Sequence, residues 1–239
     1  MTLLSTTKFI RIAVCFSVMA FAGCTLAAFS PHFPDNRPAE LESAMARLGT
    51  AETGPVNSLG RPLAFFVTSS TPPRIVAYDL SSNKVLWDVE GAPTSRLVVG
   101  RDFLFHRVGE NKMVGRQLST GEKVWEVKLR GGRLLGMATD SQTLYYVTEQ
   151  AGKRRAGHAA AVLVALKGNS GGTKWVRSSN GRLGSPAARG GLVFVPLHYQ
   201  SVGILDAKNG TEIARIRSMD EALLWVRATN HGILFGSKS

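Results

Sequence analysis

Cysteine is scarce in this sequence, and its scarcity excludes a disulfide framework. The 239 residues hold two cysteines, Cys15 and Cys24. Cys15 lies in the apolar run "IAVCFSVMAFAG", which follows Lys8 and Arg11 and is typical of an export signal that is removed after secretion. Cys24 is then the only cysteine of the mature chain. Because one thiol cannot form an internal disulfide, the sequence predicts another role for it.

The sequence also lacks a long hydrophobic run. The N-terminal run is too short to stay in a bilayer as a spanning helix, and it ends in "FAGC", Phe21 to Cys24. This ending resembles a bacterial lipobox, which implies a signal peptide over residues 1–23 and lipid attachment at Cys24. Thr25 follows the cysteine, and by resemblance to Gram-negative lipoproteins this implies the outer membrane, facing the periplasm. The alternative is an ordinary signal peptide cut near "TLAA", with Cys24 incidental.

Sequence patterns that carry catalysis, metal binding or nucleotide binding are absent. Five scattered histidines have neither metal-ligand spacing nor companion cysteines: His32, His106, His158, His198 and His231. No Walker loop or dinucleotide fingerprint occurs, and "GSPA" at Gly184 to Ala187 lacks the flanking glycines of a nucleophile elbow. We therefore expect no metal, no cofactor, no catalytic residue and no enzymatic activity.

Acidic residues are few, with 17 against 29 Lys and Arg, and the formal net charge is +12. Loss of Lys8 and Arg11 with the signal peptide leaves about +10, which favours anionic partners. The loop that holds Lys153, Arg154 and Arg155 makes the third repeat unit longer than its neighbours. It is either a contact for an anionic partner or a solvated insertion. Nucleic acid is not expected as the partner, because the chain is exported and the basic residues lack interleaved aromatics.

One pattern occurs four times along the chain. It starts at anchor positions that are 38, 50 and 39 residues apart: Asp79, Gln117, Lys167 and Asp206. Four residues after each anchor stands Asn83, Gly121, Gly171 or Gly210. Eight residues after each anchor stands Trp87, Trp125, Trp175 or, in the fourth copy, Ala214.

These offsets predict a β-hairpin in each copy. Gly and Asn accept the positive φ of a tight turn at the lowest cost, and an indole in each unit can wedge between neighbouring sheets. Asp79 and Asp206 have two interpretations, acid–base chemistry or hydrogen bonds within their own hairpins. The second is favoured because a repeated residue is usually architectural. A further pair of strands fills each interval, so that a unit of about 40 residues holds four strands.

The segments "AYDLSSNKVLW" and "GRQLSTGEKVW" resemble the pyrroloquinoline-quinone-type propeller repeat, whose core is roughly A-x-D-x-x-T-G-x-x-x-W. The resemblance covers residues 54–239 and implies an all-β propeller of four-stranded antiparallel blades. About four to five blades fit in this length, whereas family members close rings of about six to eight. The chain thus looks short at its C-terminus. It is a truncated product, half of a split protein or a small closure, and we expect an incomplete arc.

A lipidated export signal before such repeats is similar to the lipoprotein of the outer-membrane β-barrel assembly machinery, a propeller without a cofactor that acts as a docking surface. The resemblance implies a non-enzymatic envelope scaffold that docks partner proteins, including nascent outer-membrane chains, on a propeller face or edge strand. The alternative is a remnant of a quinoprotein dehydrogenase that depends on pyrroloquinoline quinone. This chain lacks the vicinal cysteines and the cluster of acidic metal ligands of that class.

Residues 24–53 are expected to form a tether with a short helix. Its opening, Pro31 to Pro38, is rich in proline and favours an extended chain. The segment "PAELESAMARL" then places Leu41, Met45 and Leu48 at helical spacing, with a proline in the first turn. Two interpretations stay open, a helix that caps the propeller and a helix that binds a partner.

Overall fold

The computed structural model describes most of the repeat region and parts of the segment before it. The described residues are 27–29, 38–51, 57–149, 160–198, 200–217, 223–229 and 231–236. The predicted signal peptide, Cys24 and the basic loop with Lys153, Arg154 and Arg155 lie outside them, so those predictions stay open. Within the described residues, no helix has the length and apolar character needed to cross a membrane.

The chain folds into five β-sheets, which we call blades 1 to 5 in chain order. Blade 1 consists of β2 (Leu63–Val67), β3 (Arg74–Asp79) and β4 (Lys84–Glu90). Blade 2 consists of β5 (Val98–Val99), β6 (Phe103–Val108), β7 (Lys112–Gln117) and β8 (Lys123–Lys128). Blade 3 consists of β9 (Arg133–Asp140), β10 (Thr143–Glu149), β11 (Ala161–Lys167) and β12 (Thr173–Ser179).

The last two blades follow the same plan. Blade 4 consists of β13 (Ala187–Arg189), β14 (Leu192–Leu197), β15 (Ser201–Asp206) and β16 (Glu212–Arg217), and blade 5 of β17 (Trp225–Thr229) and β18 (Gly232–Gly236). Within every blade, successive strands pair antiparallel. Among the described residues, blade 1 thus has three strands and blade 5 has two. The expected all-β propeller architecture is confirmed, with three blades of four antiparallel strands between two shorter ones.

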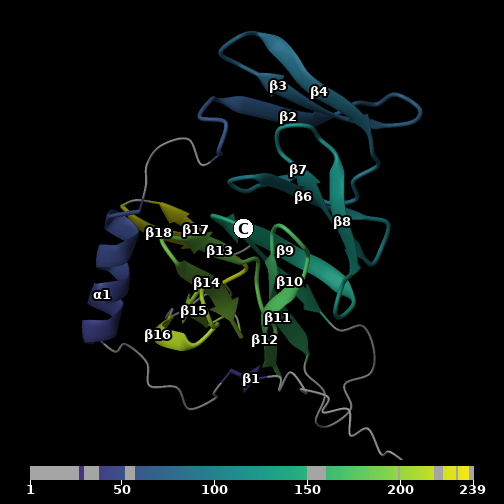
Figure 1. Ribbon diagram of the computed structural model, residues 1–239. Coiled ribbons are helices and arrows are strands. Elements are labelled where there is room, and N and C mark those ends of the chain that lie inside the picture. Colours follow the sequence, from purple (N-terminus) through teal and green to yellow (C-terminus); the bar gives the residue numbers. More distant parts are fainter. Residues whose placement is uncertain are drawn as a thin grey trace, which may run out of the picture.

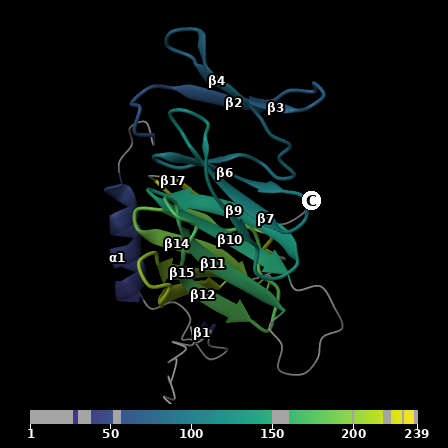
Figure 2. The same cartoon turned by 45° about the vertical axis from the view of Figure 1, so that its right-hand side comes forward.

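The blades follow one another face to face, with blade 1 at the top of Figures 1 and 2 and blade 3 below blade 2. A separate apolar cluster fills each interface between consecutive blades. Strand β11 shows why the sequence demands this. Its residues from Ala161 to Leu166 are all buried, and alternate side chains pack toward blade 2 and blade 4. A strand buried on both faces needs a neighbour on each side, as in a propeller.

One strand lies outside the plan expected from the sequence. Strand β1 (Ala27–Ala28) joins the outer edge of blade 3 by parallel pairing with β12, and the Phe29 N–H donates to the carbonyl oxygen of Ser178 at 3.0 Å. The Phe29 side chain is buried in the cluster between blades 3 and 4. This part of the predicted tether is therefore fixed to the propeller.

The predicted helix is present as α1 (Pro38–Gly49). Ala44 and Leu48 are buried in the cluster that blade 4 shares with blade 5, and Leu41 and Met45 pack against the same cluster. In Figure 1, α1 stands beside β16 and β18. The apolar stripe read from the sequence thus caps the propeller, and this face of α1 is occupied by the chain's own blades.

The position of α1 explains why the fourth copy of the repeat has alanine in place of tryptophan. Ala214 is fully buried on β16, in the cluster that contains Ala44 and Leu48 of α1. In blades 1 to 3 the equivalent indole reaches the hairpin of the next blade, as described below. On blade 4 the helix packs against this strand, and a small side chain leaves room for it.

Candidate functional site

The repeated tryptophans join each blade to the next one. Trp87, Trp125 and Trp175 are 7 to 8% exposed. Each indole Nε1–H donates to the backbone carbonyl oxygen of the residue that follows the next anchor: Trp87 to Leu118 at 2.7 Å, Trp125 to Gly168 at 2.5 Å and Trp175 to Ala207 at 3.1 Å. A buried indole that is both packed and hydrogen-bonded is a specific contact as well as a large apolar one. We call this arrangement the indole joint.

The turn glycine of the next blade completes each indole joint. Gly121, Gly171 and Gly210 have φ values of +76°, +68° and +72°. A Cβ atom at these positions would lie 2.7 to 2.9 Å from the ring of Trp87, Trp125 or Trp175, respectively. Asn83, the equivalent residue of blade 1, also has a positive φ of 54° but is exposed. Two separate constraints thus require glycine at these positions: the positive φ of the turn and the close approach of the indole ring.

The anchor positions work mainly through their backbone. The carbonyl oxygens of Gln117, Lys167 and Asp206 each accept a hydrogen bond from the N–H of the turn glycine four residues later, at 2.8 to 2.9 Å. This bond does not depend on the side chain, so the anchor tolerates an amide, a cation or a carboxylate.

Asp79 uses its side chain to bond its own hairpin turn and to bind Arg61, which precedes β2. Its Oδ1 accepts from the backbone N–H and the hydroxyl of Ser81, and its Oδ2 accepts from Arg61 Nη1 at 2.8 Å. The Ser81 hydroxyl and the Arg61 guanidinium hold the pKa of Asp79 well below its ordinary value. Asp206 likewise accepts from the N–H of Lys208 at 2.8 Å. The geometry therefore shows both carboxylates bonding their own loops, as the favoured interpretation expected.

A buried histidine that the sequence pattern did not single out lies beside the first indole joint. His106 on β6 is fully buried, and its Nε2 accepts from Arg116 Nε at 3.2 Å. Arg116 also donates to the carbonyl oxygens of Gly121 and Glu90, at 2.8 and 3.3 Å, and thus links blade 2 to blade 1. Burial lowers the pKa of His106 to about 4, and the Arg116 charge acts in the same direction. Little in the sequence indicates that His106 is buried, because a single histidine in a strand can face either solvent or the core.

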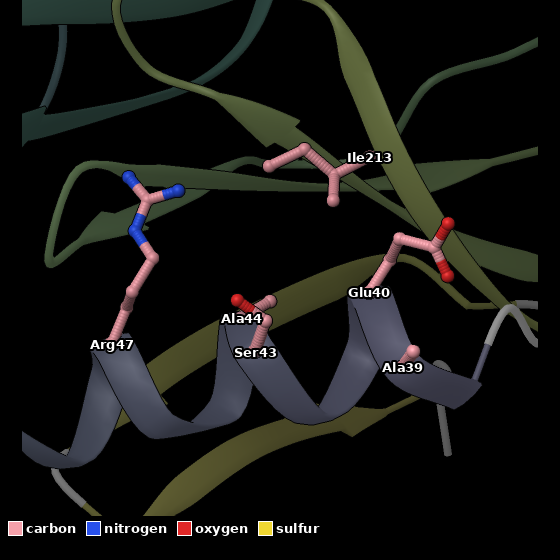
Figure 3. A pocket seen from close by; sticks show the side chains of 6 residues that line it. All are labelled: Ala39, Glu40, Ser43, Ala44, Arg47 and Ile213. Carbon is pink, nitrogen blue, oxygen red and sulfur yellow. The ribbon is translucent and has the colours of Figure 1, made fainter.

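A shallow groove lies between α1 and β16, with a volume of about 350 Å³ (Figure 3). Its lining residues are Ala39, Glu40, Ser43, Ala44, Arg47 and Ile213. Arg47 closes one end, since its Nη2 donates to the Gly191 carbonyl oxygen at 2.9 Å and its Nη1 lies 3.6 Å from Asp206. Across the described ranges, no three His, Cys, Asp or Glu residues are placed to hold a metal ion.

Apolar side chains are exposed on blade 5. Trp225 on β17 and Leu234 and Phe235 on β18 are 44, 59 and 40% exposed. In the part of the chain that the structure describes, β18 pairs only with β17, and its second edge carries no strand. An unpaired strand edge next to apolar side chains is suited to binding another extended chain. This edge is the candidate functional site.

Gly121→Ala is expected to lower the free energy of unfolding by about 2 to 4 kcal/mol, because the new Cβ strains a left-handed turn and collides with the Trp87 ring. Gly109→Ala is the matched control, since Gly109 also has a positive φ of 58° but nothing lies within 4 Å of the Cβ that alanine would add, and only the backbone strain of about 1 kcal/mol is expected. Urea unfolding of both variants checks this. Equal costs at the two positions would contradict the indole joint.

His106 is expected to stay neutral in the folded protein down to about pH 4. A histidine whose pKa is lowered by folding stabilises the protein fully above about pH 6.5, and this contribution is lost as the pH falls from there toward about 4. NMR titration of the ring nitrogens should show a protonated Nδ1, an unprotonated Nε2 and a midpoint near 4. A midpoint near the ordinary value of 6.5 would show that the ring is not buried against Arg116.

Comparison with known proteins places this repeat in a family. The family of the outer membrane protein assembly factor BamB matches residues 71–222, which is more than half of the chain. No curated protein matches the sequence.

Solved structures resemble the chain at low sequence identity. The computationally designed Ika8 protein has a TM-score of 0.53 and 12% identity, over 69% of this chain and 51% of that one. The chain therefore spans about half the length of Ika8. The computationally designed Ika4 protein has a TM-score of 0.52 and 9% identity, over 65% of this chain and 92% of that one. BamB from Moraxella catarrhalis is 16% identical over 77% of this chain and 84% of that one, with a TM-score of 0.32.

The Ika8 and Ika4 likenesses concern the fold alone, whereas the family match covers all four repeat copies, from Asp79 to Ala214. On that match, this chain belongs to the family of the outer membrane protein assembly factor BamB.

Proposed function

We propose that this protein is a non-enzymatic lipoprotein of the bacterial envelope, anchored at Cys24 in the outer membrane, whose propeller docks partner proteins in the periplasm. Its partners are envelope proteins, nascent outer-membrane chains among them. Membership of the BamB family supports a scaffold in outer-membrane protein assembly. The lipobox-like ending at Cys24 supports the anchor.

The open edge of β18 is the observation that carries the docking proposal. An extended partner segment would pair with the backbone of β18 and extend blade 5 by one strand, which supplies affinity through main-chain hydrogen bonds. Leu234 and Phe235 are adjacent in sequence and so point to opposite faces of β18. Alternate apolar side chains of the partner can therefore pack on both of them.

The same molecule provides an example of strand addition. Strand β1 pairs with the outer edge of β12 through residues that are far from it in sequence. The carboxylates considered for catalysis, Asp79 and Asp206, hold hairpin loops instead. Both features support a scaffold rather than a catalyst.

A photo-crosslinking side chain at Leu234 is expected to capture an outer-membrane protein in intact cells, because Leu234 lies on the open edge of β18. Leu80 is the matched control, since it is 56% exposed, as against 59% for Leu234, but lies on a hairpin of blade 1. Mass spectrometry of the adducts reads out the result. Similar adducts from both positions, or none from Leu234, would refute docking at this edge.

Adding pyrroloquinoline quinone together with Ca²⁺ to the purified protein is expected to give no saturable change in absorbance. A scaffold provides no cofactor pocket on the propeller, so only the spectrum of the free quinone should appear. Titration at increasing protein concentration measures this. A stoichiometric complex would favour the dehydrogenase alternative over the scaffold.

A further inference from the structure

The chain is fixed to blade 3 almost immediately after the cysteine proposed to carry lipid. Ala27 and Ala28 pair with Arg177 and Ser178 of β12, and Phe29 is buried against blades 3 and 4. Cys24 precedes Ala27 by three residues. A fully extended chain spans at most about 3.6 Å per residue, so three residues bridge at most about 11 Å. A lipid at Cys24 therefore holds this edge close to the membrane.

The charge of the outer edge of blade 3 differs from that of the other blades. Each blade from 1 to 4 presents one outermost strand, and three of these strands contain carboxylates: Asp88 and Glu90 on β4, Glu126 on β8 and Glu212 on β16. Strand β12 contains none. It carries Lys174 and Arg177, and Lys167 stands at the start of its hairpin.

The absence of acidic residues extends well beyond β12. Between Glu149 and Asp206 the sequence holds no Asp or Glu, although it holds eight Lys and Arg residues. Lys167 and Lys174 are exposed, and Arg177 is half-buried with its Nε donating to the Gly210 carbonyl oxygen at 2.6 Å. The lysines on the outer edge of blade 3 can therefore contact an anionic surface without an opposing carboxylate on the same strand.

We propose that the outer edge of blade 3, β12 with β1 across it, lies on the anionic phospholipid surface of the membrane, and that β1 sets this orientation. The inference rests on the lipid anchor of the proposed function. A lipid chain and a set of basic residues are the two signals that together give stable membrane attachment. Figures 1 and 2 show β1 and blade 1 at opposite ends of the molecule. Blade 1 thus points away from the bilayer.

Fluorescence quenching tests the orientation directly. The full lipidated chain is reconstituted in vesicles of phosphatidylethanolamine and phosphatidylglycerol that carry a nitroxide on a fraction of the head groups. A fluorophore is attached to a single new cysteine, Thr173→Cys on β12 or Val85→Cys on β4, both exposed positions of outermost strands. The chain has no cysteine besides Cys15 and Cys24, so the new thiol is the only reactive one in the mature lipoprotein.

The fluorophore at Thr173 is expected to be quenched severalfold more strongly than that at Val85. Phe29→Asp, which detaches β1, should remove this contrast while the protein stays on the vesicles. Equal quenching at Thr173 and Val85 in vesicle-bound protein would overturn the orientation.

The charge of the edge is tested with two double variants of equal charge change. Lys167→Glu with Lys174→Glu should reduce the contrast between Thr173 and Val85 severalfold. Lys84→Glu with Lys128→Glu, on the outermost strands of blades 1 and 2, should leave it unchanged. An equal effect of the two pairs, or the same contrast in vesicles of phosphatidylcholine alone, would overturn the role of anionic lipid.

Flotation of the vesicles separates this inference from the proposal on which it rests. Wild-type protein should float with the vesicles, and Cys24→Ser should not be acylated and should float severalfold less. Wild-type protein that does not float would refute the anchor itself. Wild-type protein that floats but shows no contrast between Thr173 and Val85 would refute the orientation alone.

Discussion

The contact between an indole and the hairpin of the following blade is the interaction on which this fold depends. A blade alone leaves two apolar faces in water, and its neighbours must cover them in a fixed register. Apolar packing alone defines the register between two sheets only loosely. A hydrogen bond from an indole Nε1–H to one particular carbonyl oxygen fixes that register. Trp87, Trp125 and Trp175 each make this bond across a blade interface. The turn glycine allows the ring to approach closely enough to make it.

The departures from the repeat follow from the same contact. Asn83 is accepted in blade 1 because it is exposed and no indole packs on it among the described residues, so the turn there requires only a positive φ. Ala214 replaces tryptophan on blade 4 because α1 packs against that strand. The anchor residue varies because its backbone carbonyl closes the turn. The residue type is thus constrained where an indole packs on a turn, and it varies at the anchor, where only the backbone carbonyl is used.

The features that could be predicted from the sequence are those with local periodicity. The spacing of Trp125 and Gly121 from Gln117 gives the hairpins, and the spacing of Leu41, Met45 and Leu48 gives α1. The location of α1 on blade 4, the pairing of Ala27 and Ala28 with β12, and the burial of His106 depend on contacts between distant segments. Two alanines carry no strand signal of their own, because the partner strand supplies the hydrogen bonds. The sequence predicts that an incomplete arc has an unpaired strand edge, but it does not identify β18 as the strand that carries it.

Hydrogen exchange of the indole N–H groups tests the indole joint most directly. The chain has four tryptophans, and Trp225, at 44% exposure, is the internal reference. NMR of the protein in D₂O should show the Nε1–H of Trp87, Trp125 and Trp175 exchanging as slowly as the central strand amides, and that of Trp225 far faster. Four indole protons that exchange at the same fast rate would show that tryptophan does not fasten one blade to the next.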